Sequence, residues 1–403
     1  MDFRETHSEL DRLLHTAAPL WRPAVFNQPS APWLADLPEL STALLSVDDD
    51  TLTLWQADDS ALLSGIAEHY PPALQLLNII QRLPQPSTSL KPLPDRWSWH
   101  MPGRKWQQIR YFAEQIAPVK HPMMEWCSGK AHLSRLLCRQ WAQPASALER
   151  DQQLIDSGRE LTSQDGLAVE LQRCDVLEDD TAAYFDGNRH GLALHACGEL
   201  HRHFLRQTTR HKPARISLAP CCYNLGGPEH WQPLSQFAQN SRLQLKREEL
   251  KLAVRQTVTA DSREQKRHRQ KQQWRLGFNA FWQDNTGDAS PQLSMQNARK
   301  AKSFEAFAGA LILEANKAES NRAESLRAPA APKSWKPWQI EGEALYQRVQ
   351  RLELVSMMYR RPLELWLVLD YAIALEEAGY RVHLSQFCPS HITPRNLMLD
   401  ARR

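Results

Sequence analysis

The hydrophobic pattern divides the chain into helical stretches around a central stretch of mixed pattern. Up to about residue 105, leucine and isoleucine recur at helical spacing, most clearly over 61–83, where Pro71 and Pro72 interrupt the apolar stripe. From about 103 to 282, short apolar runs alternate with amphipathic helices, as repeated strand–helix–strand units require. The pattern is helical again over 284–378.

The central stretch predicts a parallel β-sheet. Amphipathic helices are predicted at 106–116 and 131–141, before and after the first strand. Strands that are separated by helices in this way form parallel sheets with right-handed crossovers. We therefore predict an α/β fold with a Rossmann-like sheet. The five predicted strands are 122–126, 146–149, 168–173, 191–195 and 214–218.

The chain is predicted to fold as a helical N-terminal domain, a Rossmann-like core, a helical insertion and a C-terminal segment that completes the core, at 1–105, 106–283, 284–378 and 379–403. The last strand is predicted at 380–387, and the run 273–282 is a candidate for its neighbour. The sheet would then end in a hairpin whose loop has grown into the helical insertion.

Composition narrows the class of protein. The 403 residues are 42% apolar with a net charge of +3, which suits packed globular units and gives no argument for nucleic acid by itself. No apolar run of about 18 residues is present, and the N-terminus lacks a basic head before an apolar stretch, so we expect neither a membrane span nor a secretory signal. Seven cysteines without a disulfide framework favour the reducing cytoplasm. Nothing in the pattern indicates an oligomeric state.

The first polar motif lies between the first predicted strand and its helix. Residues 125–134 read Glu-Trp-Cys-Ser-Gly-Lys-Ala-His-Leu-Ser. Small residues there let the backbone approach a ligand, and the first helical turn offers unpaired N–H groups. Gly129 stands alone where a dinucleotide fingerprint has three glycines, which argues against a nicotinamide-dependent oxidoreductase and leaves an ordinary strand–turn–helix open.

Four further polar signatures follow the later strands. Glu149 comes 20 residues after Gly129, where its carboxylate could accept hydrogen bonds from ribose hydroxyls, although a solvated Glu near a helix start is an equally simple interpretation. Asp175 could bond an adenine amine or cap a helix. His-Ala-Cys-Gly at 195–198 and Pro-Cys-Cys-Tyr at 220–223 complete the set. All lie at the carboxyl ends of predicted strands, the edge where open α/β sheets bind ligands.

Together these motifs carry a family resemblance. The motif at 125–134, the His-Ala-Cys-Gly and the Pro-Cys-Cys-Tyr resemble one branch of the class I S-adenosylmethionine-dependent methyltransferases, and are more distantly similar to enzymes that methylate a ribose in the tRNA acceptor stem. The tail Ser-His-Ile-Thr-Pro-Arg-Asn-Leu at 390–397 is similar to the ending of that branch. The resemblance covers about 106–282 and 380–402. It implies a class I methyltransferase with S-adenosylmethionine as its cofactor.

The resemblance also implies roles for individual residues. The loop after the first strand would surround the methionine part of the cofactor, Glu149 would hold the ribose, and His195 would lie beneath the sulfonium. His195, Tyr223 and Cys222 are the candidates for catalysis. Cys127 and Ala131 stand where many methyltransferases have glycine, and Ala131 would narrow the loop. The full set of implied cofactor-binding residues is Glu125, Cys127, Ser128, Gly129, Lys130, His132, Glu149, Cys174, Asp175, Val176, His195, Ala196 and Cys197.

The clustered cysteines allow three interpretations. His195 with Cys197, Cys221 and Cys222 includes the ligand types of a zinc site, but the spacing is not the usual paired arrangement and adjacent cysteines rarely both bind one zinc comfortably. We therefore expect no metal here. Buried cysteines that act as small apolar residues beside a cofactor are the favoured interpretation, and a nucleophilic cysteine is the third.

One basic segment bears on the substrate. From Arg263 to Arg275 only Glu264 is acidic, so the segment could neutralise phosphates, with Trp274 available for stacking. This pattern favours an RNA acceptor, tRNA or rRNA, against the alternative of a solvated helix face. A protein or small-molecule acceptor stays open. So does a non-catalytic module that binds the cofactor weakly, which Ala131 favours.

Overall fold

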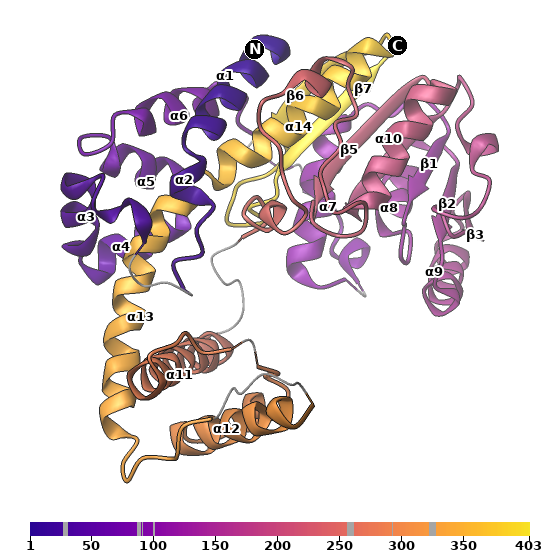
Figure 1. Ribbon diagram of the computed structural model, residues 1–403. Coiled ribbons are helices and arrows are strands. Elements are labelled where there is room, and N and C mark those ends of the chain that lie inside the picture. The colour runs from indigo at the N-terminus through magenta and orange to yellow at the C-terminus, as the bar shows by residue number, and fades with distance from the viewer. Residues whose placement is uncertain are drawn as a thin grey trace. The chain divides into compact units, whose positions relative to one another are not determined.

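The computed structural model describes residues 1–26, 31–86, 90, 92–99, 101–255, 262–291, 293–321 and 328–403. The chain forms two compact units, each built from separate stretches of sequence (Figure 1). The first unit comprises Met1–Ala18, Pro71–Arg255 and Met358–Arg403, and the second comprises Pro19–Tyr70 and Gln256–Met357.

A seven-stranded sheet forms the centre of the first unit (Figure 1). The strand order is β3-β2-β1-β4-β5-β7-β6; β1 to β5 are parallel, and β7 is antiparallel to both of its neighbours. All five predicted parallel strands are present, and the Rossmann-like α/β class is confirmed. The strands are β1 (Met123–Trp126), β2 (Ala145–Glu149), β3 (Val169–Arg173), β4 (His190–Cys197), β5 (Arg215–Cys221), β6 (Arg381–Gln386) and β7 (Leu397–Arg402).

The predicted partner of the last strand is wrong. The run 273–282 lies inside the long helix α11 (Ser262–Thr286), and β6 pairs instead with β7. The apolar residues of that run, Trp274, Phe278, Phe281 and Trp282, recur every three to four positions, which is the period of a helix. The hairpin between β6 and β7 has the short connection 387–396, so the helical insertion precedes the whole hairpin.

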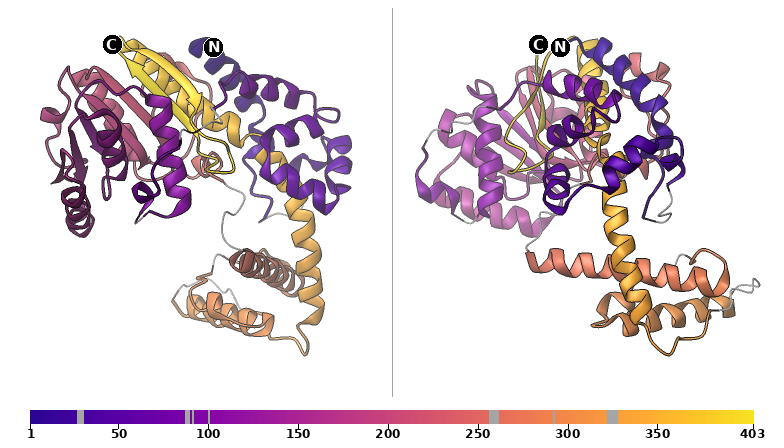
Figure 2. Two further views of the ribbon diagram at one scale, coloured as in Figure 1. Left: turned by 180° about the vertical axis from the view of Figure 1, so that it is seen from behind. Right: turned by 90° about the vertical axis from the view of Figure 1, so that its left-hand side faces the viewer.

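Helices cover both faces of the sheet in the first unit (Figure 2). Alternation along β1 shows the two faces: Met123 packs in the cluster formed with α7 and α8, whereas Trp126 packs against Phe185 and Phe204 on the other side. The α10 and α14 helices cover that second side, and α1 and α6 pack against α14. The helices are α1 (Phe3–Thr16), α6 (Pro72–Gln81), α7 (Gly103–Ile116), α8 (His132–Trp141), α9 (Gln152–Asp165), α10 (Glu199–His211) and α14 (Arg360–Glu377), with the short α2 (Ala18–Trp21) at the boundary of the unit.

The second unit is helical. Its α11 and α13 helices cross so closely that a Cβ on Gly342 would collide with the backbone of Gln273 and Gly277. An aromatic cluster that includes Phe278, Phe281 and Phe307 packs beside them. No helix among the described residues is long and apolar enough to cross a membrane. The remaining helices are α3 (Pro38–Leu45), α4 (Asp49–Ala57), α5 (Asp59–Ile66), α12 (Phe304–Asn321) and α13 (Lys336–Met357).

The units group the helices differently from the predicted segments. The helical pattern over 61–83 forms two helices, α5 and α6, because Pro72 begins a new helix at its first position. The α6 helix belongs to the unit that contains the sheet, whereas α5 belongs to the unit that contains the inserted helices. A periodic pattern shows that a helix has an apolar face, but it does not show which other element covers that face.

Candidate active site

The loop after β1 has an unusual backbone. Cys127, Gly129 and Ala131 have φ angles of 55°, 58° and 54°, the left-handed region that favours glycine. A residue with a Cβ costs roughly 1–2 kcal/mol there. The two positions where many methyltransferases have glycine therefore keep the glycine-type conformation with other side chains. Ala131 therefore raises the conformational energy of this loop and leaves its backbone shape unchanged.

Glu125 caps the helix that follows this loop. It is on the same face of β1 as Met123, and its buried carboxylate accepts the backbone N–H of Ser134 at 3.0 Å. Ser134 is in the first turn of α8, whose N–H groups have no partner within the helix. Burial raises the pKa of Glu125 to about 7, although the hydrogen bonding from Ser134 opposes this shift. The predicted contact of Glu125 with the methionine part of the cofactor stays a prediction.

The raised pKa of Glu125 makes stability depend on pH. Because the folded-state pKa of about 7 lies above the ordinary value of 4.5, the contribution of this carboxyl is fully present below pH 4.5 and is lost as pH rises through 7. Glu125→Gln has no such titration. Between pH 5 and pH 8 we expect the unfolding free energy of this variant to gain about 2 kcal/mol relative to wild type. Urea unfolding at the two pH values measures this difference. Parallel pH profiles for the two proteins, with the exposed Glu170→Gln as a control, would contradict it.

A pocket of about 320 Å³ lies at the carboxyl ends of β2, β3 and β4. It brings together six residues that the sequence analysis assigned to the cofactor. Val176 and four leucines form apolar walls, and carboxylates provide the polar positions, an arrangement typical of small-molecule sites. The lining residues are Cys127, Leu148, Glu149, Arg150, Cys174, Asp175, Val176, Leu177, Cys197, Glu199, Leu200, Leu225 and Gly226.

Glu149 is held in place by three backbone N–H groups. One carboxylate oxygen accepts from Gly129 at 2.9 Å, and the other accepts from Arg150 and Asp151, both at 2.9 Å. A carboxylate has about four acceptor positions, so one remains, on the oxygen that faces Gly129. A ribose hydroxyl can donate to that position. The pocket and this oriented acceptor therefore fit an adenosine-bearing cofactor, and they favour one ribose hydrogen bond to Glu149 rather than two.

Asp175 does not cap a helix. It begins a turn in which its side chain accepts the N–H of Leu177 at 3.2 Å, and a second carboxylate oxygen lies 3.4 Å from the exposed Arg150. This turn presents Val176 and Leu177 to the pocket. The helix-cap alternative is therefore wrong, and the predicted contact of Asp175 with an adenine amine remains consistent with its place in the pocket wall.

Gly198 is a site residue that the sequence analysis missed. Its φ and ψ angles are 55° and −119°, and a Cβ there would collide with the carbonyl oxygen of Leu225. That oxygen accepts the N–H of Glu199 at 2.9 Å, and Gly198 donates to the carbonyl of Cys221 at 3.0 Å. The glycine of the His-Ala-Cys-Gly motif thus joins the end of β4 to the segment after β5, and both contribute residues to the pocket. Its position in that motif was the available signal.

His195 has a defined tautomer. Gln108 of α7 donates its amide N–H to the carbonyl of Ile392 at 3.4 Å, which leaves its Oε1 facing His195 Nε2 at 2.5 Å. Nε2 therefore carries the proton and Nδ1 is the acceptor. Although part of the ring is exposed, desolvation by the surrounding protein, followed by the charges of Lys105 and Arg395, lowers the pKa of His195 to about 4. Gln108 is a positioning residue that no sequence signal indicated.

Tyr223 points away from the pocket. Its ring is buried, and its hydroxyl donates to Glu364 of α14 at 3.1 Å. Burial, followed by the charge of Glu364, raises the pKa of Tyr223 well above 10. A buried hydroxyl that is already bonded in the interior cannot serve as a base for a substrate, so this geometry argues against the catalytic role considered for Tyr223.

Several predicted cofactor residues lie outside the lining of the pocket. His132 is buried and its Nδ1 lies 3.2 Å from Arg135, which also pairs with Asp165. The Ser128 hydroxyl is buried without a hydrogen-bond partner among the described residues. A cofactor would reach that hydroxyl only if the loop moved. The other residues of this kind are Glu125, Gly129, Lys130, His195 and Ala196.

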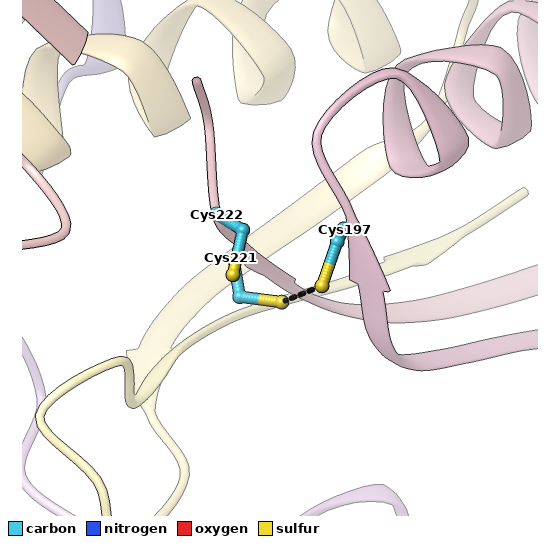
Figure 3. A group of neighbouring side chains, drawn as sticks. All are labelled: Cys197, Cys221 and Cys222. Atoms are coloured by element: carbon cyan, nitrogen blue, oxygen red, sulfur yellow. Dashed lines mark hydrogen bonds between the residues drawn. The ribbon is translucent and has the colours of Figure 1, made fainter. Parts of the chain in front are cut away.

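Three cysteines lie together beside the pocket (Figure 3). The Sγ atoms of Cys197 and Cys221 are 3.4 Å apart, and all three Sγ atoms, including that of Cys222, lie within 4.8 Å of one another. Hydrogen bonds from the other two thiols, and then the Arg395 guanidinium at 3.4 Å, hold the pKa of Cys222 below its ordinary range. Arg395 belongs to the tail motif, which thereby joins this site.

Comparison with known proteins identifies the central region. Residues 104–225 match the family of methyltransferase domains. No curated protein matches the chain. Together with the parallel sheet, the family match confirms the predicted class I methyltransferase fold and S-adenosylmethionine as its cofactor.

Solved methyltransferase structures are similar to a limited part of the chain. The tRNA (uracil-54, C5)-methyltransferase of Pyrococcus abyssi, in complex with S-adenosyl-L-homocysteine, is 16% identical over 28% of this chain and 27% of its own, with a TM-score of 0.24. The geranyl diphosphate C-methyltransferase of Streptomyces coelicolor A3(2) is 11% identical over 28% of this chain and 45% of its own, also with a TM-score of 0.24. The chain spans less than two thirds of either structure, and no acceptor follows from such a likeness.

Proposed function

We propose that this chain, whose residues 104–225 form an S-adenosylmethionine-dependent methyltransferase domain, transfers the methyl group to RNA. The observation that carries the cofactor site is the pocket at the carboxyl edge of the sheet, where Cys127, Glu149, Asp175 and Cys197 meet. The acceptor rests on separate support from α11. From the cysteine usage we further expect a cytoplasmic location.

The residues of the chain mainly bind and orient. S-adenosylmethionine supplies a methyl group on a good leaving group, so the protein has to align the acceptor with it. Glu149 offers one oriented carboxylate acceptor, and Val176 and Leu177 offer an apolar wall. The neutral His195 has Nδ1 as its one free acceptor nitrogen, because Gln108 occupies Nε2, but its lowered pKa of about 4 makes it a weak base for an acceptor hydroxyl or amine.

The first turns of α11 support an RNA acceptor. Residues 263–270 are exposed all round the helix, and among their charged side chains only Glu264 is acidic. A helix that is polar on every face has no surface to bury, so these side chains are available to phosphates. The exposed basic residues are Arg263, Lys266, Arg267, His268 and Arg269, of which Arg269 also lies over the ring of Tyr346 at 5.5 Å.

The second half of the basic segment has a structural role. Trp274 is buried against Phe304 and Phe307, so it is not available to stack on a base, contrary to the sequence-based expectation. The ammonium group of Lys271 lies 4.4 Å from the ring of Trp274, and Arg275 is half-buried with a hydrogen bond to the carbonyl of Pro291. The surface proposed for RNA is therefore 263–270 rather than the whole run to Arg275.

A salt series tests this surface. Filter binding of total RNA to wild type should weaken steeply as salt rises, because bound phosphates release counterions. Lys266→Gln/Arg267→Gln should bind more weakly and reduce the slope of log affinity against log salt by between about 1 and 2. The exposed pair Arg210→Gln/Arg381→Gln, in the other unit, is the matched control and should leave the slope unchanged. A flat response of wild type, or an equal loss in the control pair, would remove RNA from the proposal.

Methyl transfer identifies the acceptor class directly. Tritiated S-adenosylmethionine and the purified protein are incubated with RNA and protein fractions from cells that lack the gene. We expect label in the RNA fraction, and none with the Glu149→Ala variant. Label in the protein fraction alone, or in small molecules alone, would replace the RNA acceptor and leave the methyltransferase assignment intact.

A further inference from the structure

We propose that Cys197, Cys221 and Cys222 bind one zinc ion beside the cofactor pocket. The three thiols come from the ends of the adjacent strands β4 and β5 and converge on one point (Figure 3). Nothing in methyl transfer itself requires three thiols here. The site is therefore a property of this chain in addition to its methyltransferase fold.

A β-bulge aligns the first two thiols. Leu194 pairs with Ala219, but three residues later Cys197 pairs with Cys221, which is only two residues further along β5. The extra residue lies on β4, where His195 adopts a φ of 69°. With regular pairing, Cys221 would lie opposite Ala196 instead of Cys197. The side chains of Cys197 and Cys221 would then point to opposite faces of the sheet. The bulge thus places two Sγ atoms 3.4 Å apart.

A residue in the left-handed backbone conformation places the third thiol beside the other two. Successive side chains of a strand point to opposite faces, so Cys221 and Cys222 would ordinarily diverge. Cys222 instead has a φ of 49°, and the chain leaves the strand at that residue. Its Sγ therefore lies within 4.8 Å of the other two. This conformation removes the objection, made from the sequence, that adjacent cysteines do not share one metal comfortably.

The donor set and its charge suit Zn²⁺. Thiolates at a Zn–S distance of about 2.3 Å in a tetrahedron lie roughly 3.8 Å apart, so separations from 3.4 Å up to 4.8 Å need only small adjustments. Three thiolates around Zn²⁺ leave one negative charge. Arg395, 3.4 Å from the Cys222 Sγ, supplies the compensating positive charge from the tail motif. Soft thiolate donors select zinc over magnesium or calcium.

The fourth coordination position is open to a small ligand. Among the described residues, no histidine, aspartate or glutamate joins the three thiols within the same distance. Structural zinc sites close with a fourth protein ligand, whereas zinc sites with three protein ligands hold water or a substrate atom in the fourth position. Because Cys197 also lines the pocket, the ligand we assign to that position is a water molecule or a lone-pair atom of the methyl acceptor.

The strained backbone at this site argues against cysteines that act only as small apolar side chains. His195 and Cys222 each adopt the left-handed region with a side chain, at roughly 1–2 kcal/mol apiece. Buried cysteines that only fill space need no such conformations, since Cys138 and Cys388 are buried and neither has a left-handed φ. Strain at two positions that together assemble three donors is the pattern expected of a binding site.

Metal analysis tests the proposal. The untagged protein is purified without chelators, and zinc is measured by plasma mass spectrometry. We expect one zinc per chain in wild type, loss of zinc in Cys197→Ala, Cys221→Ala and Cys222→Ala, and full zinc content in the matched controls Cys138→Ala and Cys388→Ala. Circular dichroism establishes which variants are folded. Replacing zinc by Co²⁺ in wild type should give intense thiolate-to-cobalt absorption in the near ultraviolet, and this measurement needs no variant.

Three outcomes would overturn the zinc site. They are wild type that is folded but free of zinc and gives no cobalt absorption, a Cys197–Cys221 disulfide detected by mass in the protein as isolated, and iron in place of zinc. Titration with S-adenosylhomocysteine is made in parallel on the same preparations. Because this titration reports on the cofactor pocket, a failure of the zinc proposal and a failure of the methyltransferase assignment are distinguishable.

Discussion

Gly198→Ala is expected to abolish S-adenosylhomocysteine binding and to lower the unfolding free energy by about 3 kcal/mol or more. The φ and ψ angles of 55° and −119° are open almost only to glycine, and the added Cβ would collide with the Leu225 carbonyl. That carbonyl holds the N–H of Glu199, and Leu225 and Glu199 both line the pocket. Relieving the collision therefore moves two walls of the site. Urea unfolding and calorimetric titration measure the two effects.

The control for this variant is Gly103→Ala. Gly103 begins α7, has no left-handed φ and has open space where its Cβ would lie. Alanine there should leave both stability and ligand affinity near the wild-type values. Wild-type affinity in Gly198→Ala would contradict the assignment of the loop between β4 and α10 to the cofactor pocket.

Glu149→Ala is expected to weaken S-adenosylhomocysteine binding by about 100-fold or more. The variant loses the acceptor for a ribose hydroxyl, a charged hydrogen bond that contributes on the order of 1.5–3 kcal/mol. It also leaves the N–H groups of Gly129, Arg150 and Asp151 without their acceptor, so the loop that lines the pocket loses its anchor. The measurement is calorimetric titration of the folded variant.

Glu170→Ala is the matched control for Glu149→Ala. Glu170 is an exposed carboxylate on the neighbouring strand β3, and it is not among the residues that line the pocket. The control should bind as wild type does. Equal affinities for wild type and Glu149→Ala would show that the ribose lies elsewhere, and the orientation of the cofactor in this pocket would then be wrong.

The parallel half of the fold was accessible from the sequence because its signals are local. Each of the five strands lies next to an amphipathic helix and carries a short apolar or alternating pattern, as in Val-Glu-Leu-Gln-Arg of β3, and the polar motifs follow the strands directly. The antiparallel hairpin was not predicted correctly. β7 carries the buried Asp400, which pairs with Arg215 of β5 at 2.7 Å, so the strand lacks a continuous apolar pattern. A buried ion pair between distant residues leaves no periodicity to read.

In the candidate site, too, residues with local sequence signals were predicted and residues that depend on long-range contacts were not. Glu149, Asp175 and Cys197 were predicted from their places at strand ends, and they do line one pocket. Gln108, which fixes the His195 tautomer, lies 87 residues away in sequence on a helix with no distinctive motif. The left-handed conformations at Cys222 and His195 accompany a bulge in the pairing of β4 with β5, which a local pattern does not encode. The role of Gly198 required the position of Leu225 as well.

The assignment of the pocket to an S-adenosyl cofactor is tested most directly by calorimetric titration of the full chain with S-adenosylhomocysteine. The geometry predicts one molecule bound per chain with a Kd in the micromolar range or below, a free energy of about −8 kcal/mol or more favourable. Absence of binding at millimolar ligand by a folded protein, with no thermal stabilisation in the same buffer, would contradict it.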